Sequence, residues 1–201
     1  MEQRALDHWH DAAQKYQDDS DFSFGEQWSG ADIERRKRQG RASITYNVLA
    51  AFVKRLTNSV RQAPPAIQIH PVADGATSEA AKALSGLIMG IEYRSSAQTA
   101  YCYALSCSAR GGYGAWRVVV DEEGDPRIET VLDPTALMWD PAAQREDFSD
   151  ARWCIYRQML DVAVIRETYG DDAVIGHPEG GEVEICELWI REAGQVVQYL
   201  Y

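Results

Sequence analysis

Several carboxylates between residues 140 and 150 are the first side chains whose type and spacing could support chemistry. Asp140, Glu146, Asp147 and Asp150 offer the hard oxygen ligands that Mg²⁺ prefers. One hypothesis is therefore a metal-dependent phosphate-processing enzyme that uses Asp140, Asp147 and Asp150 together with a distant basic run. Asp-Pro and Ser-Asp pairs are also frequent turn builders. We favour a surface turn here, and expect no metal ion and no other cofactor.

The basic run itself is the second candidate. Five cations fall within seven positions, at Arg35, Arg36, Lys37, Arg38 and Arg41. Such a run can contact nucleic acid, or it can be a solvated or inter-subunit salt-bridging segment in a chain with 31 acidic residues. We favour the second interpretation, because no aromatic stacking platform accompanies the basic residues.

The glycine-rich stretch "SARGGYGAWRVVVDEEGDP", residues 108–126, invites comparison with a phosphate-binding loop. A dinucleotide fingerprint needs a strand, then the glycines, then a helix, so that helix N-terminal amides face the phosphate. Here the predicted order is helix, glycines, strand, and no Gly-Lys-Ser/Thr is present. The glycines are therefore interpreted as a helix stop followed by a hairpin.

No nucleophilic or metal-ligating pattern emerges from the remaining residues. The cysteines at 102, 107, 154 and 186 are dispersed and are expected to be buried small hydrophobes in a reduced, cytosolic chain. His8 and His10 would point in different directions on a helix. We expect no catalytic residue and no enzyme activity.

The elements that must position these residues change in character along the chain. Residues 3–17 and 46–62 predict amphipathic helices, and the acidic stretch between residue 18 and Trp28 predicts a loop. Residues 66–72 alternate as a short strand. Further helices are expected from Ser78 and after Ser96, the latter ending at Gly112. In the helix over 46–62 one apolar row consists of Val48, Phe52, Leu56 and Val60, with Leu49 and Val53 beside it. In the helix from Ser78 the stripe expected to be buried consists of Ala80, Leu84, Leu87, Ile88 and Ile91.

Beyond residue 113 the apolar period changes from that of a helix to that of a strand. Residues 115–120 and 127–132 flank a polar turn and predict a hairpin. A strand near 151–159, a short helix capped by Asp161, and a final strand pair follow. The fold class expected is α+β, with N-terminal helices followed by antiparallel hairpins. We expect one region, mainly helical over 1–112 and mainly β over 113–201.

Composition narrows the function classes. The 201 residues carry a net charge of −11, which disfavours a protein whose main task is to grip nucleic-acid phosphates. No apolar run approaches the roughly 20 residues needed to span a bilayer, and the N-terminus has no apolar segment of a signal peptide. The expected partners therefore do not include a membrane.

The order of several phrases resembles one family. "FSFGEQW", a basic stretch and "GRASITYNVLAAFVKRLTNSVRQAPPAIQIHPV", entered near Asn47, are similar to the N-terminal region of portal proteins from short-tailed double-stranded-DNA phages. "GGYGAWRV" and "DPTALMWDPAAQREDFSDARW" follow in the same order as in that family. The resemblance runs from about Asp21 to Trp189.

The resemblance implies a structural subunit with a portal wing-like fold. Portals form a ring, usually of twelve subunits, at one capsid vertex in the virion, after assembly in the host cytoplasm. Double-stranded DNA passes through the channel without specific binding, and the ring contacts capsid, terminase and tail proteins. Family members are several hundred residues longer, so we expect a truncated chain without the channel-lining and terminase-binding segments. Another head-completion or adaptor protein of the virion is the remaining alternative.

Overall fold

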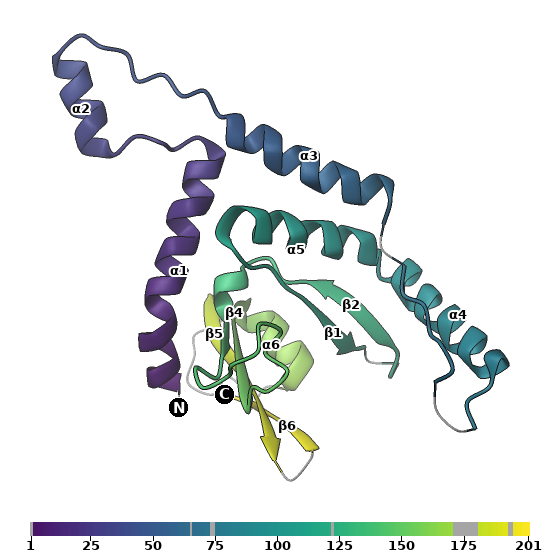
Figure 1. Ribbon diagram of the computed structural model, residues 1–201. Coiled ribbons are helices and arrows are strands. Elements are labelled where there is room, and N and C mark those ends of the chain that lie inside the picture. The colour runs from purple at the N-terminus through teal and green to yellow at the C-terminus, as the bar shows by residue number, and fades with distance from the viewer. Residues whose placement is uncertain (1, 65, 73–74, 122, 171–180, 193–194) are drawn as a thin grey trace. The chain divides into compact units, whose positions relative to one another are not determined.

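The computed structural model describes residues 2–64, 66–72, 75–121, 123–170, 181–192 and 195–201. The chain folds as two compact units, one of residues 1–13 with 135–201 and the other of residues 14–134. Helices precede antiparallel strands along the chain, which confirms the predicted α+β class (Figure 1). The expectation of one wing-type region, helical over 1–112 and β over 113–201, stays a prediction.

The unit of residues 14–134 is built mainly from helices. Its elements are the second half of α1 (Glu2–Phe24), then α2 (Gly30–Arg38), α3 (Val48–Gln62), α4 (Ser78–Arg94), α5 (Ala97–Gly111), β1 (Trp116–Val120) and β2 (Pro126–Thr130). Strands β1 and β2 form the predicted hairpin, with Val118 opposite Ile128. Helix α5 contacts α3, α4 and both strands of the hairpin, and so forms the centre of this unit (Figure 1).

Small side chains allow α5 to take this central position. Its buried residues are Ala97, Ala100, Cys102, Ala104 and Cys107. Alanine and cysteine add little bulk, so neighbouring backbones can approach α5 closely. The predicted end of α5 is confirmed, because Gly112 has φ +93° and its N–H donates to the Ser108 carbonyl oxygen at 3.0 Å.

The other unit combines the first half of α1 with a four-stranded antiparallel sheet and one further α-helix among the described residues. Its elements are η1 (Pro134–Ala136), which begins at the boundary, β3 (Leu137–Trp139), β4 (Trp153–Asp161), α6 (Val162–Tyr169), β5 (Glu182–Glu192) and β6 (Gln195–Leu200). The strand order is β3-β4-β5-β6. The predicted cap of α6 is confirmed, since the Asp161 carboxylate accepts from the Ala163 N–H at 2.7 Å.

Two apolar clusters hold this second unit together. Met138, Trp153 and Ile155 form one cluster, and the start of α1 packs on it through Leu6 and Trp9. The Trp9 indole N–H donates to the Trp139 carbonyl oxygen at 2.9 Å. The other cluster consists of Val162, Ile165 and Ile185, and seats α6 against the sheet.

Two local predictions are wrong. Helix α1 continues through the acidic stretch to Phe24, where Gly25, with φ +113°, ends it. Buried Ser20 and Ser23 lie in these last turns, so tertiary packing overrides their loop preference. Residues 66–72 are not a strand: the structure shows no ladder partner for the described segment, and Ile69 donates instead to the Ser85 hydroxyl at 3.4 Å.

Candidate inter-subunit surfaces

The predicted basic run lies on α2 and just after it. Helix α2 begins at Ser29, whose hydroxyl accepts from the Asp32 N–H at 3.1 Å. The Ser-x-x-Asp spacing of this cap was the sequence signal for a helix that periodicity alone did not indicate. No residue of α2, all of which the structure describes, is buried. We call residues 25–47, which contain α2 and its two connections, the arm.

The five basic side chains of the arm differ in their interaction partners. Arg35 pairs with Asp32 on the same helix. The Arg36 guanidinium lies 4.4 Å from the Trp28 ring centroid and donates to the Ala42 carbonyl oxygen at 2.7 Å. Trp28 is thus an aromatic neighbour that sequence reasoning did not connect to the run, and its face is occupied by Arg36 rather than free for a base.

The other three cations, Lys37, Arg38 and Arg41, have no carboxylate partner among the described residues. The Arg38 Nε donates only to the Glu34 carbonyl oxygen, at 3.4 Å. These three side chains are exposed. The five basic residues therefore fall into two sets: Arg35 and Arg36 contact other residues of the arm, and Lys37, Arg38 and Arg41 are exposed.

One asparagine closes the base of the arm. The Asn47 side-chain Nδ2 donates to the Ser23 carbonyl oxygen at 2.7 Å, and its Oδ1 accepts from the Ala50 N–H at 3.0 Å. The first bond reaches the end of α1 and the second caps α3. Because Gly25 lies against the Asn47 amide, both ends of the arm meet at this residue. The sequence marked Asn47 only as a helix entry and gave no sign of the Ser23 contact.

Helix α3 exposes most of the apolar row that the sequence places on it. Its buried residues are Val53 and Thr57, which belong to a neighbouring face. Phe52 is 68% exposed, and Val48 and Leu56 on the same row are exposed as well. Helix α3 is apolar on two adjacent faces, and the face that carries Val53 and Thr57 is the buried one, in a unit where α3 contacts α5. The row Val48, Phe52 and Leu56 is an apolar surface open to a partner.

Helix α4 repeats this pattern. Ala81 is its buried residue, whereas Leu84 and Leu87 of the predicted buried stripe are exposed. Ile88 and Ile91 are half-buried. Two of the helices therefore carry more apolar surface than their own unit covers, which is typical of a subunit that is completed by neighbours.

The glycine-rich stretch is structural, as predicted. A Cβ on Gly111 would overlap the Tyr16 ring, and a Cβ on Gly114 would overlap the Ala104 carbonyl oxygen. Tyr16 in turn packs against Tyr113, with ring centroids 5.0 Å apart. The glycines let the chain leave α5 and pass close beside it into β1. No phosphate-binding geometry is involved, because the helix precedes the glycines.

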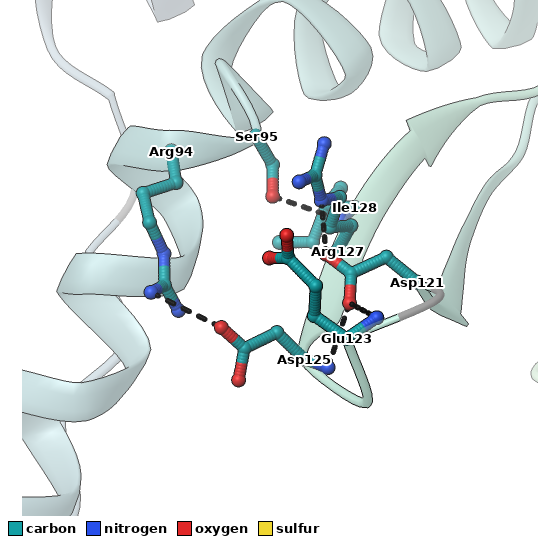
Figure 2. Close-up of polar contacts among 7 residues, drawn as sticks. All are labelled: Arg94, Ser95, Asp121, Glu123, Asp125, Arg127 and Ile128. Atoms are coloured by element: carbon teal, nitrogen blue, oxygen red, sulfur yellow. Dashed lines mark hydrogen bonds and ion pairs between the residues drawn. The ribbon is translucent and has the colours of Figure 1, made fainter.

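The hairpin that follows is fixed by its acidic turn (Figure 2). The Asp121 carboxylate accepts from the Asp125 N–H at 2.8 Å and from the Arg127 guanidinium at 2.6 Å. These hydrogen bonds, the backbone one first, hold the pKa of Asp121 below its usual value. The Ser95 hydroxyl accepts from the Ile128 N–H at 3.0 Å and ties β2 to the end of α4.

The carboxylates of the metal hypothesis are engaged in turns. Asp140, only 4% exposed, accepts from the Arg152 guanidinium at 2.7 Å, and this bond, before the others, lowers its pKa. Asp150 accepts from the Gln144 N–H at 2.8 Å, and backbone N–H groups lower its pKa too. Asp147 accepts from Ser149. Among the described residues no group of three or more His, Cys, Asp or Glu side chains could hold a metal ion.

The enzyme hypothesis has no further support in the geometry. Burial raises the pKa of the Cys154 thiol to about 12, so this sulfur is a poor nucleophile at neutral pH. The other three cysteines are buried and unbonded to one another. None of the helices in the described part of the chain is long and apolar enough to cross a membrane.

A family model described as phage P22-like portal protein matches residues 2–201. The chain therefore belongs to the phage P22-like portal protein family, and the resemblance seen in the sequence is confirmed. Portal proteins are structural components of the virion, located at the capsid vertex through which the genome is packaged. The outward-facing apolar helices agree with a protein that works by assembly, and nothing in the geometry favours the metal-dependent or adaptor alternatives.

Proposed function

We propose that this chain serves as the wing-type region of a portal subunit in a closed homo-oligomeric ring, with twelve copies. The observation that carries the proposal is the family match over residues 2–201. The exposed rows of α3 and α4 support it, because head-to-tail contacts close into a ring only when each subunit has two complementary surfaces.

In this role the protein has no catalytic step of its own. Double-stranded DNA passes through the ring without sequence-specific binding, during packaging and again during ejection, while capsid, terminase and tail proteins bind the outside. A chain with net charge −11 agrees with passage rather than retention, since phosphate contacts increase with positive charge. Assembly takes place in the host cytoplasm before the particle is filled.

We further propose that Arg35, Arg36, Lys37, Arg38 and Arg41 act in inter-subunit contact rather than in contact with DNA. Two of the five already brace the arm through Asp32 and Trp28. An arm that is stiffened internally presents its remaining cations in a fixed arrangement, which suits a defined protein partner.

A conditional stop codon in the gene tests this function. If the protein is the portal, infection without it yields capsids that contain no DNA, and supplying the wild-type protein restores filled particles. Filled, infectious particles assembled without the protein would contradict the proposal. Extracts without the protein should retain full terminase nuclease activity, whereas a loss of Mg²⁺-dependent cleavage would favour the enzyme alternative.

A further inference from the structure

The arm carries positive charge on a chain that is otherwise strongly acidic. Residues 25–47 contain five basic and three acidic side chains, so the arm has a net charge of +2 and the rest of the chain −13. Outside the arm, most salt-bridged arginines pair with a carboxylate on another element or turn. Examples are Arg117 with Glu129 and Arg157 with Glu184. In the arm, Lys37, Arg38 and Arg41 hold none among the described residues.

The arm makes little contact with its own subunit. The hydrogen bonds that its described residues make join it to itself or to the helix ends at its base, such as Asn47 to Ser23. Ile44 and Tyr46 in the connection to α3 are exposed, Tyr46 by 84%. The arm thus has cations without a carboxylate partner among the described residues, exposed apolar side chains and no buried residue on its helix. It lacks a partner within its own subunit.

The end of α1 is the complementary surface. Asp18, Asp19 and Asp21 lie in its last two turns, and no basic residue lies in the last turn. The C-terminal end of a helix already carries partial negative charge, so carboxylates there are unfavourable unless a cation approaches. The Asp18 and Asp21 carboxylates accept from the neutral amides of Gln14 and Gln17, and no salt bridge joins them to a cation among the described residues.

Several other acidic groups are less suitable partners because an arginine of their own chain compensates them. Asp121 is paired with Arg127 and Asp125 with Arg94 (Figure 2). Asp140 is paired with Arg152. Near the end of α1, the Arg110 guanidinium lies over an aromatic ring, 4.5 Å from the Phe24 ring centroid. The exposed Phe22 beside Asp21 adds an apolar contact of the kind that Ile44 and Tyr46 would cover.

From this complementarity we infer that the arm of one copy docks on the acidic C-terminal end of α1 of the next copy in the ring. In this contact, Lys37, Arg38 and Arg41 of one copy form ion pairs with Asp18 and Asp19 of the next copy. The contact is head-to-tail, since the two surfaces differ, and such a contact repeats around a closed ring. The inference rests on the proposed ring function and names its contact.

Charge reversal tests this contact. The arm variant carries Lys37→Glu, Arg38→Glu and Arg41→Glu, and the α1 variant carries Asp18→Lys and Asp19→Lys, both in the complete portal protein. Each variant alone should assemble into rings roughly tenfold less well at about 0.1 M salt, because like charges would face each other at every interface. The deficit should shrink at about 1 M salt, where exposed charges are screened.

Mixing the two variants separates a contact between copies from one within a chain. Between copies, the acidic arm of one variant meets the basic α1 of the other, and the reverse holds at the next interface. The mixture should therefore form rings that contain both variants in equal number. If each arm instead binds its own α1, mixing restores nothing, and the inference is overturned.

A matched control carries the same net charge as the arm variant. Lys54→Glu, Arg61→Glu and Lys82→Glu change the charge as much as the arm variant does, at exposed positions of α3 and α4. Because α3 and α4 are themselves proposed as assembly surfaces, this control is compared by mixing: together with the α1 variant it should not restore full ring formation, and restoration equal to that given by the arm variant would contradict the docking site. Circular dichroism and thermal melting should be unchanged in all variants. A wild-type protein that forms no ring would refute the proposed function itself. Arm variants that form normal rings but package less DNA would refute only the inference, and would assign the arm to contact with DNA.

Discussion

Helices α3 and α5 have the same length, 15 residues each, and lie in contact within one unit, yet they use their side chains in opposite ways. Helix α5 buries five small residues and is enclosed by α3, α4 and the hairpin. Helix α3 buries two residues and leaves a row of large apolar side chains in the open. The difference separates what stabilises the unit from what remains available to a partner: α5 forms the internal core, and α3 presents the exposed apolar row that we propose for assembly.

The largest effect is expected where the chain passes closest to α5. Gly114→Ala should destabilise the unit by about 3 kcal/mol, because the added Cβ would overlap the Ala104 backbone and force β1 away from the helix. Urea denaturation followed by circular dichroism measures this loss.

Gly86→Ala is the matched control. Gly86 lies inside α4, where an added Cβ would meet no atom within 4 Å, and its φ is not positive. Replacing glycine by alanine in a helix interior should stabilise the protein by about 0.5–1 kcal/mol. If both substitutions had the same small effect, α5 would not be the tightly packed centre described above.

A smaller loss is expected at the start of α3. Asn47→Ala removes the cap of α3 and the bond to Ser23, and should cost about 1–2 kcal/mol. Because these bonds also close the arm, hydrogen exchange should accelerate over residues 25–47.

Asn58→Ala serves as its control, since Asn58 is exposed in the middle of α3. Exchange over residues 25–47 should then be unchanged. Rapid exchange in both variants would mean that general weakening of α3, and not the clamp at Asn47, releases the arm.

The regions around the two helices should also differ in their response to acid. The pKa of Asp121 is lowered mainly by the hydrogen bond from the Asp125 backbone, so its charged form stabilises the hairpin that packs on α5. That contribution is present above the ordinary pKa of 3.8 and is lost as pH falls through the lowered value. Helix α3 contains no acidic residue.

Comparing Asp121→Asn with the wild type between about pH 2 and pH 7 measures this contribution. The free energy of unfolding of the variant should fall less steeply with acid, and exchange at the hairpin should change before exchange in α3. An identical acid dependence for the two proteins would contradict the assigned role of Asp121.

The smallest effect on the isolated chain is expected on the outer row of α3. Phe52→Ser with Leu56→Ser should change the free energy of unfolding by no more than about 0.5 kcal/mol, because both side chains are exposed. The same double variant should reduce ring formation, as measured by sedimentation of the complete protein. Marked destabilisation of the isolated chain would show that this row belongs to the core after all.

Local signals in the sequence were sufficient for much of the fold. The cap at Asp161, the stop at Gly112 and the alternating strands at Val118 and Ile128 depend on neighbouring residues, and all are present. Periodicity could not distinguish the two apolar faces of α3, because burial depends on which partner is present. For the same reason the stripe of α4 that was expected to be buried leaves Leu84 and Leu87 exposed.

The basic run shows the same limit at the level of the site. Sequence located the five cations but not their division into two sets, because that depends on where Asp32 and Trp28 lie once α2 has formed. The sequence also predicted a loop where the last turns of α1 lie. The position of its carboxylates at the partially negative C-terminal end of a helix was therefore not recognised. Contacts between segments distant in sequence, such as Asn47 with Ser23, leave no local signal.

Native mass spectrometry of the complete portal protein is the decisive experiment on assembly. We expect a closed ring of twelve copies, assembled through surfaces that include α3, and disruption of that ring by Phe52→Ser with Leu56→Ser at unchanged subunit stability. A protein that stays strictly monomeric under conditions of capsid assembly would contradict the ring and the role of α3 in it.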